Sequence, residues 1–183
     1  GTQKCLSAPT GLSPVALRER ALHKLNNRKT KKLSWYFDLS EIMKYWDEGS
    51  KTRPYHHTAP INNIYALHKA LGIILDEGLE SRFRRHEANA ALLQSGLEEM
   101  GFTYAVQNPK QRLPMLHAVY LPENVNEAQL RGGLLSNYNI EIGAGLGEFK
   151  GKAVRIGLMG YSSTEDRVKN LLHAIKDTIH SKS

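Results

Sequence analysis

The chain has 183 residues, of which 40% are hydrophobic and 23% charged, and this composition excludes a disordered protein. It contains no run of about 18 apolar residues that could span a membrane, and its single cysteine excludes an internal disulfide and a cysteine-based zinc cluster. The formal net charge is +7, most of it from the 11 Lys and Arg against 5 Asp and Glu in residues 1–54, which keeps a nucleic-acid-binding function under consideration.

The first 60 residues predict two short helices joined by loops. Ser13 followed by Pro14 is typical of a helix start, because a hydroxyl caps free amides and proline fits the first helical position. Apolar residues then recur at helical spacing. The expected elements of this part are a loop over 5–13, a helix from Ser13 to 26–27, a helix over 39–46 and a loop over 47–60.

A change of pattern near Gly78 predicts a domain boundary. Pro60 opens a long helix that Gly78 interrupts, and a second helical run continues to about Met100. Beyond Gly101 strands and helices alternate. The expected elements there are strands over 103–106, 115–121, 139–143 and 153–159, and helices over 126–137 and 164–180.

Two motifs could bind a ligand but are better explained as structure. Residues 143–147 form a glycine-rich stretch, yet no helix follows it to receive a phosphate, so a tight turn between strands is expected. The pair His56-His57 has no third ligand at metal spacing. We therefore expect no metal and no nucleotide at these positions.

Arg155 is the more informative polar residue. It lies in the alternating stretch 153–158, where a buried guanidinium would need an anionic partner, and the pattern leaves a bound ligand and an ion pair both open. Lys4, a lysine near the start of the sequence, does not by itself indicate a function. Cys5 does not either, since most lone cysteines are small buried side chains.

Four segments, taken in chain order, resemble the class V, fold-type I, pyridoxal-phosphate aminotransferases, nearest to the alanine–glyoxylate and serine–pyruvate branch. They are Gly1–Lys4 with Ala8–Ser13, Tyr55–Pro60, Gly145–Gly147 and Val154–Gly160. The resemblance covers the whole chain, but in that family the lysine lies past the middle, so the chain is similar to the C-terminal half. The fold implied is α/β: the C-terminal, mostly helical part of the large cofactor domain over 1–77, then an α+β small domain over 78–183.

The resemblance also implies roles for five residues. Lys4 would be the catalytic residue that forms the Schiff base with pyridoxal 5'-phosphate, and Gln3 would bind the cofactor phosphate. Tyr55 and Thr58 would reach the phosphate of the other subunit's cofactor in a homodimer with shared active sites. Arg155 would hold the substrate carboxylate, because a planar guanidinium makes two parallel bonds to it.

The function implied is a ping-pong transamination from alanine or serine to glyoxylate or pyruvate, in a cytoplasmic protein without a membrane or nucleic-acid partner. The chain alone is expected to be inactive. Another class V aminotransferase, of 3-hydroxykynurenine or phosphoserine type, stays open, as does a basic nucleic-acid-binding module. A desulfurase is disfavoured, because Cys5 directly follows Lys4 rather than lying on a mobile loop of its own.

Overall fold

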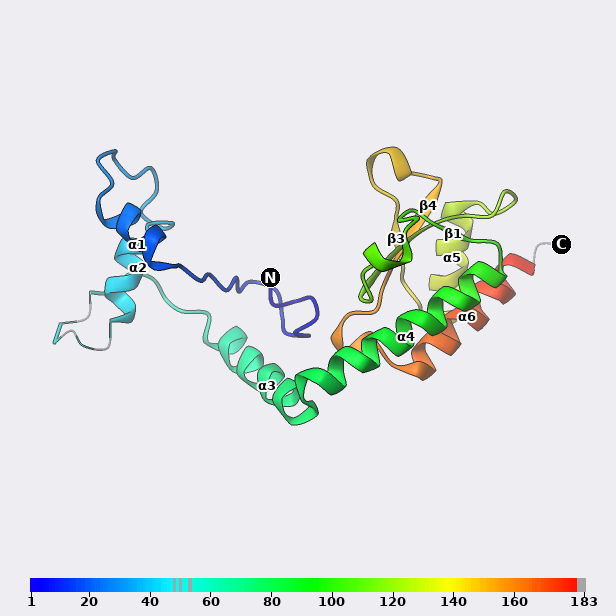
Figure 1. Ribbon diagram of the computed structural model, residues 1–183, viewed down its shortest axis with the longest axis horizontal. Helices are drawn as coiled ribbons and strands as arrows, with labels where there is room; N and C mark the ends of the chain where they lie inside the picture. The colour runs from blue at the N-terminus through cyan, green and yellow to red at the C-terminus, as the bar shows by residue number, and fades with distance from the viewer. Residues whose placement is uncertain (48, 50, 53, 181–183) are drawn as a thin grey trace.

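The computed structural model describes residues 1–47, 49, 51–52 and 54–180, so part of the expected 47–60 loop lies outside the described residues. Two helices, α1 (Glu19–Asn26) and α2 (Leu39–Trp46), lie together at one end of the molecule. A long helix, α3 (Ile61–Glu77), leads from them to a compact unit of helices and strands at the other end (Figure 1).

The predicted helix start at Ser13 and Pro14 is wrong. Helix α1 begins only at Glu19, and none of its residues is buried. Residues 1–12 instead close on themselves, because the Thr2 amide donates to the Leu12 carbonyl oxygen at 3.3 Å. The apolar side chains expected to anchor that helix find little packing, and without packing a short helix has little stability.

Residues 1–77 are also less helical than expected. Their helices α1, α2 and α3 have 8, 8 and 17 residues, and loops make up the rest of the described part. The helix predicted over 39–46 is confirmed at both ends. Asp38 caps it, because its side chain accepts a hydrogen bond from the Ser40 amide at 3.0 Å.

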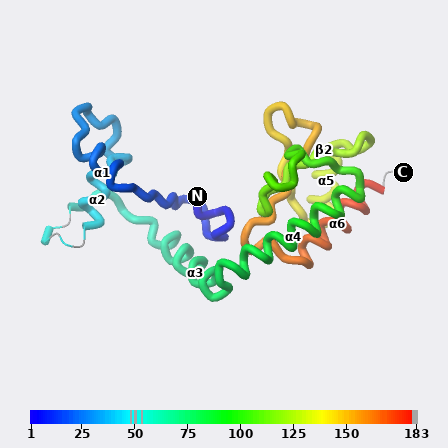
Figure 2. Tube along the Cα trace, viewed as in Figure 1, coloured from blue at the N-terminus to red at the C-terminus, as the bar shows by residue number. Residues whose placement is uncertain are grey.

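Gly78 separates α3 from α4 (Leu79–Glu99), as the sequence predicts. It has a φ of +80°, a region that glycine enters without steric cost, and it ends one helix while it begins the next. The two helices therefore meet at a bend, seen most clearly in the tube view (Figure 2).

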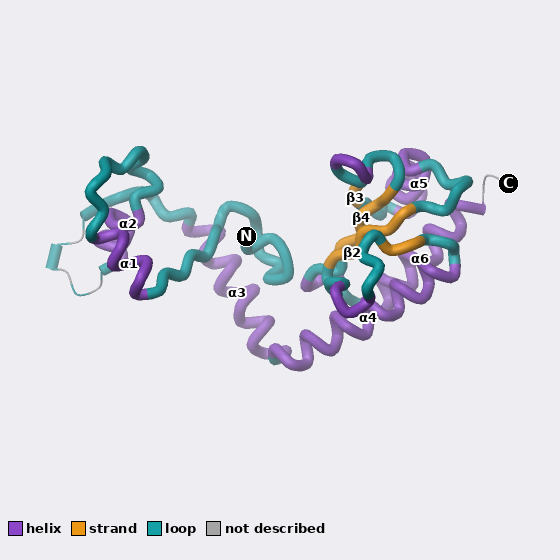
Figure 3. Tube along the Cα trace, turned by 45° about the horizontal axis from the view of Figure 1, so that its top comes forward, coloured by secondary structure: helices purple, strands orange, loops and turns teal. Residues whose placement is uncertain are grey.

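The unit that follows Gly78 contains a four-stranded sheet with antiparallel neighbours in the order β1-β2-β4-β3. Figure 3 shows its short strands beside the helices. The strands are β1 (Thr103–Tyr104), β2 (Leu116–Tyr120), β3 (Gly143–Ala144) and β4 (Ala153–Gly157); the helices are α4, α5 (Glu127–Tyr138) and α6 (Glu165–His180). Three single 3-10 turns complete it: η1 (Pro109–Gln111), η2 (Gly147–Phe149) and η3 (Gly160–Ser162).

The strand expected over 139–143 is mostly absent. Helix α5 continues through Tyr138, and Asn139 ends it in the left-handed conformation with a φ of +54°. Asparagine tolerates that conformation better than most residues. Strand pairing begins only at Gly143, opposite Arg155.

The two faces of the sheet differ in burial. His117, Val119, Val154 and Ile156 point to the side where the helices pack, and all four are at most 3% exposed. The hydrophobic core gathers there, from Leu93 on α4 to Ile175 on α6. Because side chains alternate along a strand, Arg155 lies on the other face, away from this core. None of the described helices is long and apolar enough to cross a membrane.

Candidate active site

Lys4 lies in the loop of residues 1–12, hereafter the N-terminal loop. Its side chain is exposed, as is that of Gln3, while the neighbouring Thr2 is fully buried. The Thr2 hydroxyl donates to the Pro9 carbonyl oxygen at 2.8 Å, and the Ala8 amide donates to the Thr2 carbonyl oxygen at 3.1 Å. These bonds shape the loop and leave the amine of Lys4 free to meet a ligand.

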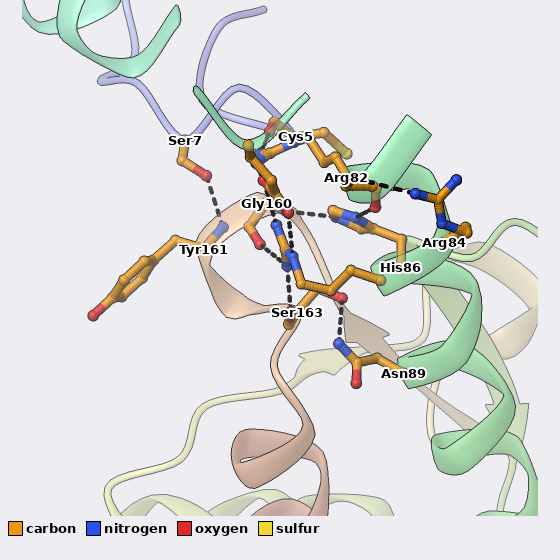
Figure 4. Close-up of polar contacts among 12 residues, drawn as sticks. Cys5, Ser7, Arg82, Arg84, His86, Asn89, Gly160, Tyr161 and Ser163 are labelled. Carbon is orange, nitrogen blue, oxygen red and sulfur yellow. Dashed lines mark hydrogen bonds and ion pairs between the residues drawn. The ribbon is translucent and has the colours of Figure 1, made fainter. Parts of the chain in front are cut away.

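The N-terminal loop contacts the turn η3, which follows β4. The Tyr161 amide donates to Ser7 Oγ at 2.9 Å, across 154 positions of sequence (Figure 4). Gly160 leaves no room for a side chain, because a Cβ there would lie 2.0 Å from Ser7 Oγ and 2.7 Å from the Cys5 carbonyl oxygen. The structure thus brings together the segments that carry Lys4 and Arg155.

A cluster of charges lies beside this contact. Glu77, at the end of α3, accepts from Arg82 Nη1 at 2.7 Å and from Arg85 Nε at 2.5 Å. The hydrogen bonds from Arg85 lower the pKa of Glu77 to about 2 against the opposing effect of burial, and those from Arg82 add to the lowering. We call Glu77, Arg82 and Arg85 the Glu77 cluster.

His86 joins α4 to the same turn. Its Nε2 lies 3.1 Å from the Gly160 amide, and its Nδ1 lies 2.8 Å from the Arg82 carbonyl oxygen. An amide only donates and a carbonyl only accepts, so the geometry requires a neutral imidazole with the proton on Nδ1. Three residues further along α4, Asn89 donates to Ser163 Oγ at 3.2 Å (Figure 4).

Arg155 donates one hydrogen bond to the backbone, and the η nitrogens of its guanidinium remain available to a ligand. Its Nε donates to the Ala144 carbonyl oxygen at 2.8 Å, and its guanidinium lies over Gly143, where a Cβ would be 3.3 Å from Nη2. No ion pair of Arg155 occurs among the described residues. The Nε contact fixes the plane of the guanidinium, so the two η nitrogens can present a fork to a carboxylate.

Tyr55 and Thr58 are brought together with each other, and their hydroxyl groups are hydrogen-bonded. Tyr55 is 70% exposed, and the segment lies between α2 and the start of α3. The N-terminal loop reaches that end of α3 through Thr10, whose carbonyl oxygen accepts from Asn63 Nδ2 at 2.9 Å. Cys5, next to Lys4, is instead bonded to Arg82, just beyond the other end of α3.

The two motifs interpreted as structural have structural surroundings. Residues 145–152 connect β3 to β4, and a Cβ at Gly145 would lie 2.1 Å from the Phe149 carbonyl oxygen, so only glycine fits that turn. His56 stacks on Trp35 with ring centroids 4.1 Å apart, and its Nδ1 lies 2.8 Å from that of His57. Within the described ranges no three His, Cys, Asp or Glu side chains gather as a metal site would require.

Sequence reasoning missed the Glu77 cluster, His86 and Ser7. The three charged residues of the Glu77 cluster belong to two different helices, α3 and α4, so no single helical spacing relates them. Ser7 carried one weak signal, its place between Lys4 and Pro9, but its φ of +57° could not be anticipated.

Nearly the whole chain is similar to known proteins. The family described as aminotransferase class-V matches residues 1–171. An alanine–glyoxylate aminotransferase of Rattus norvegicus is 37% identical over 179 residues, which cover 98% of this chain and 43% of the relative. An (S)-ureidoglycine–glyoxylate transaminase of Bacillus subtilis is 34% identical and is covered over 46% of its length.

Solved structures agree with the sequence relatives. An alanine–glyoxylate aminotransferase from Nostoc sp. superposes with a TM-score of 0.90 at 41% identity, covering 98% of this chain and 46% of that one. The chain therefore spans less than half the length of the relatives it matches. The expected fold, the C-terminal part of an α/β aminotransferase of fold type I, is confirmed.

Proposed function

The chain belongs to the class V aminotransferase family, and from this premise we propose that it supplies the lysine and the carboxylate-binding arginine of a transamination. The reaction moves an amino group from a small 2-amino acid to a 2-oxo acid. One observation carries the proposal: the loop that holds Lys4 is hydrogen-bonded to the turn that follows Arg155's strand, through Ser7 and Tyr161. An amine and a guanidinium on adjoining segments can serve the two ends of one amino acid.

Aminotransferases of this family depend on pyridoxal phosphate. When bound, the cofactor supplies an electron sink for the carbanion that forms when Cα loses its proton. The side chains fit such a group, because Lys4 offers an exposed primary amine and Gln3 an exposed amide donor for phosphate. In our proposal Lys4 holds the cofactor covalently and Gln3 binds its phosphate.

Two residues of this chain would act on the substrate. The η nitrogens of Arg155 would hold the carboxylate and so orient the Cα–H bond. The freed, neutral amine of Lys4 would take the proton from Cα and later return it, as a positioned general base and acid does. No other titratable side chain of the described residues is needed for this proton transfer.

We propose that Tyr55 and Thr58 serve the other subunit of a homodimer. Cys5 is anchored near one end of α3 while Thr58 precedes the other end, and a 17-residue helix is about 25 Å long. Thr58 is therefore badly placed for a phosphate held beside Lys4 of the same chain. Exposed aromatic side chains around this segment also call for a covering surface; they include Trp35, Tyr36, Phe37, Trp46, Tyr55 and Tyr65.

For substrates we propose alanine or serine as the donor and glyoxylate or pyruvate as the acceptor. The relatives in Rattus norvegicus and Bacillus subtilis share glyoxylate in their names and differ in the donor. A phosphoserine aminotransferase from Cytophaga hutchinsonii is 20% identical, a likeness that supports the fold alone. The relatives extend far beyond the matched region, so we expect the 183 residues alone not to sustain turnover.

The test uses the full-length protein incubated with pyridoxal phosphate. Borohydride reduction followed by peptide mass spectrometry should find the pyridoxyl group on Lys4, and alanine with glyoxylate should yield pyruvate and glycine. A pyridoxyl group on any other lysine would overturn the assignment. Labelled Lys4 without exchange between alanine or serine and either oxo acid would retain the family role and overturn the proposed substrates.

A further inference from the structure

We propose that Glu77 is a positioning residue that fixes the N-terminal loop, and with it Lys4, relative to the end of β4 and Arg155. The proposal rests on the proposed function for the roles of Lys4 and Arg155. Its physical basis is a joint between two segments far apart in sequence. The local stability of that joint can be measured in an experiment that does not depend on enzyme activity.

One carboxylate orients two guanidinium groups. Glu77 Oε2 accepts from Arg82 Nη1 at 2.7 Å and from Arg85 Nη2 at 3.0 Å, while Oε1 accepts from Arg85 Nε at 2.5 Å. The pairing with Arg85 is bidentate, and a bidentate pair fixes direction as well as distance. Because guanidinium is planar and rigid, the outer nitrogens of both arginines are fixed by the same carboxylate.

Each arginine uses an outer nitrogen on a different segment. Arg82 Nη2 donates to the Cys5 carbonyl oxygen at 2.6 Å, directly after Lys4. Arg85 Nη1 donates to the Gly160 carbonyl oxygen at 3.2 Å and also to that of Ser163. Arg82 therefore holds the N-terminal loop, and Arg85 holds the turn that continues from β4.

The two held segments also fit closely against each other. The Ser7–Tyr161 hydrogen bond joins them directly, and the absent side chain of Gly160 lets the backbones approach. Arg82 is 8% exposed and His86 6%, so solvent competes little for the bonds of these two side chains, whereas the side chains of Glu77 and Arg85 are 24% and 30% exposed. A shift of the carboxylate would be transmitted to both segments, because the same two guanidinium groups that it orients donate to Cys5 and to Gly160.

Such a joint matters because a transaminating site acts on both ends of a small substrate. With the carboxylate on Arg155 and the amino group directed to Lys4, the distance between the two segments decides whether the Cα–H bond meets the amine. A misplacement of about 1 Å in a catalytic group costs up to about a hundredfold in rate. Both oxygens of the Glu77 carboxylate bind arginines, so in this proposal Glu77 acts on geometry and not on substrate or cofactor.

The experiment compares three variants of the full-length protein. Glu77→Gln keeps the shape of the side chain but removes the charge and one acceptor. Arg82→Lys and Arg85→Lys keep a cation but lose the fork that spans two partners. Glu80→Gln is the matched control, because Glu80 is an exposed carboxylate in the first turn of α4.

Amide hydrogen exchange of folded protein is the first readout. We expect Arg82→Lys to speed exchange by about tenfold in residues 4–8 alone, Arg85→Lys in residues 158–163 alone, and Glu77→Gln in both, as local opening predicts. Glu80→Gln should change neither segment. If Glu77→Gln does not fold, the two lysine variants still separate the segments. Wild-type exchange in both segments of the folded variants would overturn the proposal.

Steady-state kinetics is the second readout. Glu77→Gln should lower kcat by about tenfold, Arg82→Lys should act mainly on kcat, and Arg85→Lys should raise KM for the amino acid. Equal effects of all three variants on kcat and KM would mean that the cluster is only structural. If exchange changes as expected but the wild-type protein does not transaminate, the proposed function fails and the joint stands.

Discussion

The hydroxyl of Tyr104 lies 3.0 Å from Nδ1 of His117 in the core of the small sheet, and both residues are at most 4% exposed. His117 Nε2 lies 3.3 Å from the Pro114 carbonyl oxygen, which can only accept. Nε2 therefore carries the proton, Nδ1 accepts from the phenol, and the buried imidazole is neutral.

This pair predicts a loss of stability in mild acid. Burial lowers the pKa of His117 below its ordinary 6.5, so the unfolded state takes up a proton first as the pH falls. The stabilisation is complete above about pH 6.5 and declines as the pH drops towards the folded-state pKa. Urea unfolding of full-length protein from about pH 8 to 5 should show this decline. His117→Gln should flatten it, and identical slopes for both proteins would show that another group is responsible.

Replacing Lys4 should separate binding from turnover. Lys4→Ala should abolish amino-group exchange, because no other amine takes the place of the base, while pyridoxal phosphate still binds non-covalently. Loss of the lysine-bound absorbance band and assays of pyruvate formation would check both points. Lys24→Ala, an exposed lysine of α1, should behave as wild type. Turnover retained in Lys4→Ala would remove Lys4 from the mechanism.

Arg155 should act on substrates that carry a carboxylate. Arg155→Ala should lower kcat/KM by about a hundredfold, since losing hydrogen bonds between charged groups costs about 3 kcal/mol. The comparison is between an amino acid and the matching amine without a carboxylate, which should lose nothing. Arg20→Ala, on the exposed surface of α1, provides the control. An equal loss for both substrates would make Arg155 structural.

Two glycines should respond oppositely to the same added methyl group. Gly145→Ala should destabilise the protein by about 3 kcal/mol, because the new Cβ would meet the Phe149 carbonyl oxygen at 2.1 Å. Gly132→Ala should stabilise it by up to about 1 kcal/mol, because Gly132 lies within α5 and nothing lies within 4 Å of its Cβ position. Thermal unfolding should give a lower Tm for Gly145→Ala and a higher Tm for Gly132→Ala than for the wild type. Equal shifts of Tm would contradict this prediction.

The sequence predicted the elements whose signals are local. The helix over 39–46 is predicted correctly because its apolar residues keep helical spacing, and the Asp38 cap that the structure adds agrees with that start. Gly78 is also predicted correctly as a break, because a glycine that interrupts a helical run is a local signal too. The start at Ser13 failed because a cap signal needs packing to become a helix, and Val15 is 64% exposed.

The joint around Glu77 could not be predicted, for a physical reason. Glu77 precedes the break at Gly78 and its arginine partners follow it, so the bend sets their distance, and no helical periodicity contains it. The neutral state of His86 depends on the Gly160 amide, 74 positions away. The resemblance of motifs named Lys4 and Arg155, but the contacts that hold them together belong to tertiary structure.

Both edges of the sheet are strands of only two residues, β1 and β3. Short edges give the strands of a neighbouring molecule little backbone to pair with, which is how natural sheets avoid aggregation. Residues 79–180 also contain nearly the whole hydrophobic core. In protein engineering, we expect this stretch, extended to keep Glu77 with Arg82 and Arg85, to be the part to produce alone, whereas the aromatic surface of the residues before Gly78 should be kept with a covering partner.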